Sequence, residues 1–176
     1  MKHCKWLSLL LSVSLLCTLL SGCAAAAKQD PLKTLRSARF ITASDGETLF
    51  TMEWSETGGV YRSVYRFSSP ELLQPLLVTV TDGKVIASYQ GLETEVTDEF
   101  CGGILPLFYA MKAFAMKAEI GGQRAGGQSY LRATLDADTF LMYYDPESGS
   151  FTRLEWVGNH GSGSLEILSC TASNSE

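Results

Sequence analysis

The sequence predicts an α+β fold, in which about eight antiparallel strands form one meandering sheet that one or two helices cover. Three observations support this prediction. Apolar and polar residues alternate along most of the chain, for example in "TLFTMEW" (48–54), as in half-buried strands. Asp82-Gly83 lies between two β-branched runs, which is a strong hairpin signal. Between residues 104 and 119 the alternation gives way to good helix formers.

The first 22 residues have the layout of a secretory signal peptide. Lys2 and Lys5 form a short positive region, and an apolar stretch dotted with serines runs from Trp6 to Leu20. A bilayer-spanning helix needs about 20 mainly apolar residues, and this stretch is shorter. The sequence therefore predicts that residues 1–22 are a signal peptide and not a permanent membrane span.

The end of this stretch, Leu20-Ser21-Gly22-Cys23, resembles the lipobox of bacterial lipoproteins. The two small residues fit a narrow protease cleft, and the Cys23 thiol is the nucleophile that takes the lipid. The resemblance implies that Cys23 is the lipidated first residue of a protein held at the extracytoplasmic face of the cell membrane. Each buried methylene contributes about 0.8 kcal/mol, so two or three acyl chains make a durable anchor. The alternative is ordinary cleavage near Ala24 to Ala27, which leaves a soluble secreted protein.

The mature chain is expected to be acidic and to sit close to the membrane. Residues 23–30 read as a lipidated tether that reaches roughly 25 Å. Without residues 1–22 the chain keeps twelve basic and nineteen acidic residues, a net charge of −7. Such an acidic surface argues against a nucleic-acid partner and against binding to anionic lipids through a cluster of basic residues. Contact with the membrane is therefore predicted to run through the lipid anchor.

Two cysteines, Cys101 and Cys170, remain once Cys4 and Cys17 leave with the signal peptide and Cys23 carries lipid. An even pair in an exported protein favours a disulfide. The alternative is two separate buried thiols, which are common for free cysteine.

Residues 31–170 are predicted to form a single domain, and residues 171–176 a disordered tail. Asp30-Pro31 predicts the start of a short helix that ends near Ser37. "GNHGSGS" (158–164) reads as a flexible link before the last strand. The expected strands are "TLFTMEW", "VYRSVYRF", both halves of "LLVTVTDGKVIASYQG", "LETEV", Tyr130–Leu135, Phe140–Tyr144, Phe151–Val157 and Leu165–Cys170.

A second helix is predicted over Ile104–Glu119, bounded by Gly102-Gly103 and Gly121-Gly122. A single antiparallel sheet buries one face and wets the other, so this apolar helix is the expected cover of the buried face. On the helix, Met111 is expected to face the sheet and Lys112 to face solvent.

The order of these elements resembles the LolA/LolB-like fold of bacterial envelope proteins. The resemblance rests on the opening helix, "RFSSPE", "TDGKVIASYQG", the mid-chain helix and "YYDPESGSFTRLEW". The chain is also similar to small lipoproteins of Gram-positive anaerobes that carry "SPE-L", a "DGK" hairpin and "Y-GL". This resemblance implies a curved antiparallel sheet, a half-barrel of about eight strands with helices on its concave face. It also implies a carrier of acyl chains, without a match at any single binding residue.

Catalytic and metal-binding patterns are not evident. The mature chain has a single histidine, His160, and it lies between glycines, so the sequence predicts an exposed loop residue and not a general base. Glu93 and Glu95 fall on one face of a strand and read as a solvated surface. Phosphate-binding and nucleophile-elbow motifs do not occur in the sequence. The prediction is a protein that is not an enzyme and has neither cofactor nor metal.

The aromatic and methionine side chains are the remaining candidates for a site. They are predicted either to line a cavity for an apolar ligand, such as a lipid, or to pack as an ordinary core. Two functions therefore stay open: binding or sensing of an apolar ligand at the membrane, and a structural or interaction module of an envelope complex. The candidate lining residues are Phe50, Met52, Trp54, Leu107, Met111 and Phe114.

Overall fold

The computed structural model describes residues 30–97, 102–116, 118–119 and 129–172. In this part of the chain, one antiparallel sheet of eleven strands is accompanied by two α-helices, which confirms the α+β class. The helices are α2 (Pro31–Ser37), α3 (Ile104–Met116) and a short 3-10 helix, η1 (Glu71–Leu73). The strands are β1 (Phe40–Ser44), β2 (Leu49–Thr57), β3 (Val60–Ser69), β4 (Leu76–Thr81), β5 (Lys84–Tyr89), β6 (Leu92–Val96), β7 (Ala118–Glu119), β8 (Ser129–Leu135), β9 (Asp138–Tyr144), β10 (Phe151–Gly158) and β11 (Gly161–Thr171).

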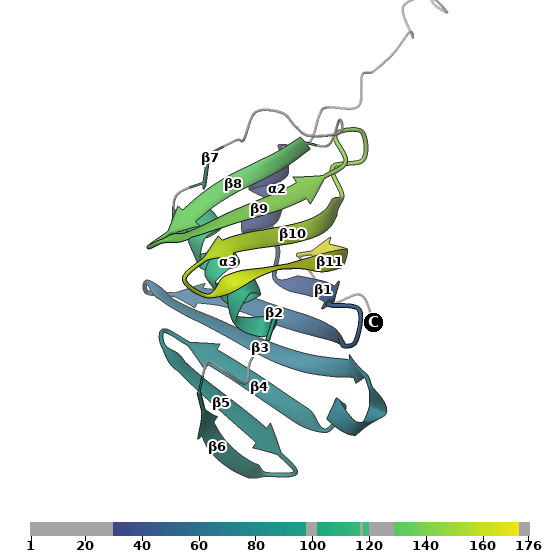
Figure 1. The fold of residues 1–176 in the computed structure, drawn as a ribbon, viewed down its shortest axis with the longest axis vertical. Helices are drawn as coiled ribbons and strands as arrows, with labels where there is room; N and C mark the ends of the chain where they lie inside the picture. Colours follow the sequence, from purple (N-terminus) through teal and green to yellow (C-terminus); the bar gives the residue numbers. More distant parts are fainter. Residues whose placement is uncertain (1–29, 98–101, 117, 120–128, 173–176) are drawn as a thin grey trace, which may run out of the picture.

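The sheet consists of two meanders joined side by side. Strands β1 to β6 pair in chain order, as do β7 to β11, and the pairing of β1 with β11 connects the two sets. Figure 1 shows the resulting open sheet, with β6 at one end, β7 and β8 at the other, and α3 lying across one face. We call the face covered by α3 the inner face and the opposite one the outer face.

Side chains alternate between the two faces along each strand, and this alternation sets which residues face inward. On β2 the buried residues are Phe50, Met52 and Trp54, separated by partly exposed ones, as the sequence predicted. Their cross-strand partners lie on the same face. Met52, for example, lies opposite the fully buried Tyr65, whose hydroxyl donates to the Ile104 carbonyl oxygen at 2.8 Å.

The first helix has the predicted bounds. Asp30 caps it by accepting hydrogen bonds at Oδ1 from the backbone N–H groups of Leu32 (3.0 Å) and Lys33 (3.4 Å), and Pro31 occupies the first turn. Arg36 near its end donates from Nε to the Phe114 carbonyl oxygen at 3.2 Å, so α2 is tied to α3.

The second helix ends at Met116, three residues earlier than predicted. Ala118 and Glu119 instead form β7 and pair with Ala133 and Arg132 of β8. Helix propensity is a weak preference, and the unpaired edge of β8 offers hydrogen bonds that override it. Figure 1 shows β7 beside β8 at this edge.

Two further expectations were wrong. The strand count is eleven in the described residues and not about eight, chiefly because β1 and β7 were not foreseen. The segment expected to be a flexible link is an ordered hairpin, in which Gly158 pairs with Gly161 and Trp156 with Gly163. A two-residue turn, Asn159-His160, therefore joins β10 directly to β11.

Lys112 is also placed differently from the expectation. Its Nζ forms an ion pair with Asp82 Oδ1 at 2.8 Å and lies 5.6 Å from the centre of the Tyr61 ring. The side chain is therefore not free in solvent, because it fastens α3 to the turn between β4 and β5.

Candidate functional site

An apolar pocket of about 380 Å³ lies between the inner face of β2 to β6 and the beginning of α3. Its volume falls near the lower end of the range of about 300–1,000 Å³ that is typical of ligand pockets. The wall is formed by eight apolar residues, two polar ones and two glycines: Phe50, Phe67, Leu73, Leu76, Val78, Ala87, Val96, Ile104, Asp45, Thr48, Gly102 and Gly103.

The pocket exists because α3 is too short to cover the whole sheet. A helix of thirteen residues is about 20 Å long, whereas eleven strands span about 48 Å between the two outermost ones. Among the described residues, α3 packs on β8 and β3, and the inner face of β4 and β5 ranges from the buried Val80 and Val85 to the half-exposed Tyr89. Val78 and Ala87, paired across β4 and β5, form part of the pocket floor, and Val78 is buried.

The structure divides the predicted lining residues into two groups. Phe50 lines the pocket, where its ring lies 5.8 Å from that of Tyr65 and 6.0 Å from that of Phe67. Phe50 is also a buried core residue, as are the other five, none of which is more than 7% exposed: Met52, Trp54, Leu107, Met111 and Phe114.

Seven of the eight apolar wall residues were not among the sequence candidates. The period-2 pattern of β4 and β5 puts Val78 and Ala87 on one face, and this signal could have identified them. Leu73 and Ile104 could not be found in this way, because they come from η1 and from the first turn of α3.

Asp45 is the one ionisable residue among the described residues of the pocket wall. Its Oδ1 accepts from the backbone N–H groups of Glu47 (3.0 Å) and Thr48 (2.7 Å), and Oδ2 accepts from the Thr48 hydroxyl at 2.9 Å. Partial burial raises the pKa of Asp45, but these hydrogen bonds outweigh the burial and hold the pKa below its usual value. The carboxylate is therefore charged and fixed in place at neutral pH.

His160 is exposed in the turn between β10 and β11, as expected, but several contacts fix its position. Its Nδ1 is hydrogen-bonded to Oδ2 of the buried Asp138, its backbone N–H donates to Oδ1 at 3.2 Å, and its ring lies 4.6 Å from that of Tyr109 on α3. Burial raises the pKa of Asp138, but the hydrogen bonds from His160 and Asn159 lower it by more, so the pKa lies below its usual value. The arrangement fastens the β10–β11 hairpin to β9 and to α3.

The glycine before this turn is required by the same contact. Gly158 has a φ of +153°, and a Cβ atom there would collide with the Asp138 carboxylate and lie 2.6 Å from the Ala137 carbonyl oxygen. The glycines around His160 therefore shape a tight hairpin and do not provide flexibility.

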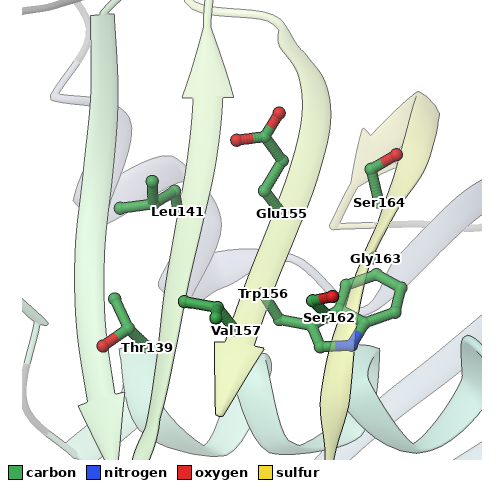
Figure 2. Close-up of a pocket in the computed structure, with 8 residues that line it drawn as sticks. All are labelled: Thr139, Leu141, Glu155, Trp156, Val157, Ser162, Gly163 and Ser164. Atoms are coloured by element: carbon green, nitrogen blue, oxygen red, sulfur yellow. The ribbon is translucent and has the colours of Figure 1, made fainter.

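A second hollow, of about 330 Å³, lies on the outer face of β9 to β11 (Figure 2). Cross-strand pairing aligns Leu141, Glu155 and Ser164 in one row and Thr139, Val157 and Ser162 in the next. The Trp156 ring lies across Gly163, where a Cβ atom would be 2.5 Å from the indole. This mixed and shallow surface offers a ligand less apolar contact than the pocket under α3.

The remaining sequence candidates give no further site. Cys23 and Cys101 lie outside the described residues, so lipidation and the Cys101–Cys170 disulfide stay predictions. Cys170 lies on β11 opposite Ile41, and burial raises the pKa of its thiol to about 12.

Glu93 and Glu95 are exposed on β6, as expected for a solvated face. Among the residues that the structure describes, no cluster of three or more His, Cys, Asp or Glu could hold a metal ion.

Comparison with known proteins adds no family. No protein-family model matches the chain, and no curated protein is similar enough to count as a relative. Within the described part of the chain, no helix has the length and apolar character needed to cross a bilayer.

Proposed function

We propose that this protein is a lipoprotein, anchored through Cys23 at the extracytoplasmic face of the cell membrane, that binds or senses an apolar ligand such as a lipid or an acyl chain. The domain would work as a LolA/LolB-like half-barrel, with the ligand held between the sheet and α3. The role is one of binding and not of catalysis. The observation that carries the proposal is the apolar pocket beside the first turn of α3.

The physical support is the unfilled apolar surface of the pocket wall. Each square ångström of apolar surface removed from water contributes about 25 cal/mol, so a hydrocarbon chain that contacts these side chains gains free energy. The core beneath α3 is already closed, because Met52, Leu107 and Phe114 are buried. A ligand that fills the pocket therefore adds contacts without displacing packed residues.

The anchor is tested by labelling cells with palmitate and separating membranes from the soluble fraction. We expect the wild-type protein to carry label and to sediment with membranes. Cys23→Ala should carry no label and should either be released or remain as the uncleaved precursor. A Cys23→Ala protein that is processed and still sediments with membranes would contradict the anchor.

Ligand binding is tested on the mature chain, residues 23–176 with Cys23→Ala, purified without detergent and analysed by native mass spectrometry. We expect a co-purifying lipid. Ala87→Trp should fill the pocket and abolish the bound mass, because Ala87 is part of the pocket wall. Its matched control is Ile86→Trp, which puts the same side chain on the outer face of β5. Equal lipid content in both variants would contradict a ligand in this pocket.

The second candidate function, an interaction module of an envelope complex, is favoured by one observation. Leu72 in η1 is 79% exposed, so a large apolar side chain lies at the surface where a partner protein would cover it. If the purified protein carries no lipid, and cells with Ala87→Trp behave like cells with the wild-type protein, the interaction module becomes the better description of the function.

A further inference from the structure

The charges around the apolar pocket restrict which ligand it can hold. The twelve wall residues that the structure describes include no lysine, arginine or histidine, and Asp45 supplies the single charge among them. A carboxylate or phosphate that enters such a site finds no cation to pair with. Burial of an unpaired anion is costly, so an anionic end group would have to stay in water.

The position of Asp45 strengthens this restriction. Asp45 Oδ1 accepts from the backbone N–H groups of Glu47 and Thr48, and Oδ2 accepts from the Thr48 hydroxyl; these hydrogen bonds orient the carboxylate and favour its charged form. The turn that carries it joins β1 to β2. In an antiparallel meander this turn lies at the same end of the sheet as η1 and the β5–β6 turn, and Figure 1 shows these connections on one side of the sheet. The polar end of a ligand at this end of the pocket meets a negative charge.

The apolar surface continues beyond the pocket toward the edge of the sheet. Leu76 of the pocket wall pairs with Tyr89 on β5, and Tyr89 pairs with Leu92 on β6, so all three side chains share the inner face. Tyr89 is 41% exposed and Leu92 79% exposed. With strands about 4.8 Å apart, this row extends the apolar surface by roughly 10 Å past Leu76.

We infer that the ligand is a long hydrocarbon chain whose polar end carries no negative charge, and that part of the chain lies on Tyr89 and Leu92. The inference rests on the proposed function and narrows the ligand class to neutral or cationic amphiphiles, such as monoglycerides and long-chain alcohols or amines. Free fatty acids and lipids with an anionic group beside the chain are excluded from the pocket.

The test is displacement of an uncharged fluorophore, N-phenyl-1-naphthylamine, from the mature chain with Cys23→Ala at neutral pH. Laurate, its monoglyceride and laurylamine are compared as competitors, because they share the length of the chain and differ in the charge of the end group. We expect the monoglyceride and the amine to displace the probe at roughly tenfold lower concentration than laurate, since the carboxylate meets a like charge and no cation.

Two variants and a control test whether Asp45 causes the charge preference and whether Leu92 contacts the chain. Asp45→Asn keeps a hydrogen-bond acceptor for the turn and should bring laurate close to the monoglyceride, with a melting curve that checks the fold. Leu92→Ser should weaken a stearoyl monoglyceride several-fold and leave a caprylyl one unchanged, since the short chain does not reach β6. Val157→Ser, a matched control on the outer face of β10, should alter neither.

The outcomes separate this inference from the function on which it rests. If the probe does not bind to the wild-type protein, the proposed function fails, and the inference fails with it. If the probe binds and laurate displaces it as well as the monoglyceride does, the function stands and the charge restriction is overturned. If Leu92→Ser affects long and short chains alike, the placement of the chain on β6 is wrong.

Discussion

Two rows of side chains on the same face of the sheet show how differently its two ends are built. At one end, four residues paired across β8 to β11 are at most 1% exposed: Leu131, Met142, Leu154 and Leu165. At the other end, the row across β4 to β6 consists of Leu76, Tyr89 and Leu92, and its exposure rises toward the edge strand. Both rows are apolar, so composition does not explain the difference.

The difference in exposure between the two rows comes from the positions of the two α-helices. α3 packs on β8 and β3, and α2 packs on α3, so the β8–β11 end is sealed by a second layer. At the β4–β6 end the described residues are covered only in part: Val80 and Val85 are buried, Tyr89 and Leu92 are exposed, and the pocket occupies the space beside the first turn of α3. We therefore expect stability to be more sensitive to substitutions at the closed end than at the open end, where the proposed ligand would lie. Substitutions should separate these two roles.

The largest effect is expected from a charge under the helix. Met111 is 2% exposed, and Met111→Asp would bury a carboxylate without a partner, so we expect a loss of about 3 kcal/mol or more in the free energy of unfolding. Met116→Asp on the same helix is the control, because Met116 is 55% exposed and should tolerate the charge. Chemical denaturation measures both. Similar midpoints for the two variants would show that α3 does not seal the closed end.

The Asp138–His160 contact should give the next largest effect. Asp138→Asn removes the charge that accepts from His160, and we expect a loss of about 1–3 kcal/mol at neutral pH. The folded-state pKa of Asp138 is lowered below 3.8, so the ionised group contributes stability above that pH and loses the contribution as the pH falls through the folded pKa.

The measurement is the gap in unfolding free energy between the wild type and Asp138→Asn from about pH 5 down to about pH 2, and the gap should shrink over this range. Asp136→Asn, an exposed carboxylate in the preceding turn, is the control and should change little. A gap that stays constant across the range would mean that the charge of Asp138 has no part in stability.

Much of this fold could be predicted from local patterns, because the forces that set them act within a few residues. Asp82-Gly83 forms the expected hairpin, since Thr81 pairs with Lys84, and α2 begins at its predicted cap. β1 could not be predicted in the same way. It is short, and although it pairs with the neighbouring β2, its other partner β11 lies more than a hundred residues away in the chain, so its place inside the sheet is a property of the whole sheet.

The sequence predicted that the candidate site would be apolar, but it did not predict where on the sheet the site lies. Apolar stripes on β2 and α3 indicate which side chains face inward, but they do not show which part of the sheet the helix covers. The stripes therefore pointed to Met52 and Met111, which form core, and missed Val78 and Ala87. The order of the segment around His160 was missed for a related reason: Asp138, the partner of His160, is 22 residues earlier in the chain, and flanking glycines alone suggest flexibility.

A smaller effect, of opposite sign, is expected at Ser63. This residue on β3 lies between Trp54 and Val80 on the inner face, is fully buried, and has no hydrogen-bond partner for its hydroxyl among the described residues. Because a buried polar group without a partner is unfavourable, Ser63→Ala should stabilise the protein by about 1 kcal/mol. Thermal unfolding measures it, with the exposed Ser55→Ala as the control. Destabilisation by Ser63→Ala would mean that the hydroxyl has a partner, such as a buried water.

The smallest effect is expected where α3 meets the open end. Lys112 pairs with Asp82 at 2.8 Å, and the pair lowers the pKa of Asp82, but both side chains are partly exposed. Water and salt screen such pairs, so a double-mutant cycle of Lys112→Ala and Asp82→Ala should give a coupling of about 0.5 kcal/mol that weakens in high salt. A coupling above about 2 kcal/mol, or one that salt does not change, would show that the open end is held as firmly as the closed one. The contrast between the two ends would then lie in the partial cover of the open end alone, and not in how firmly α3 is attached.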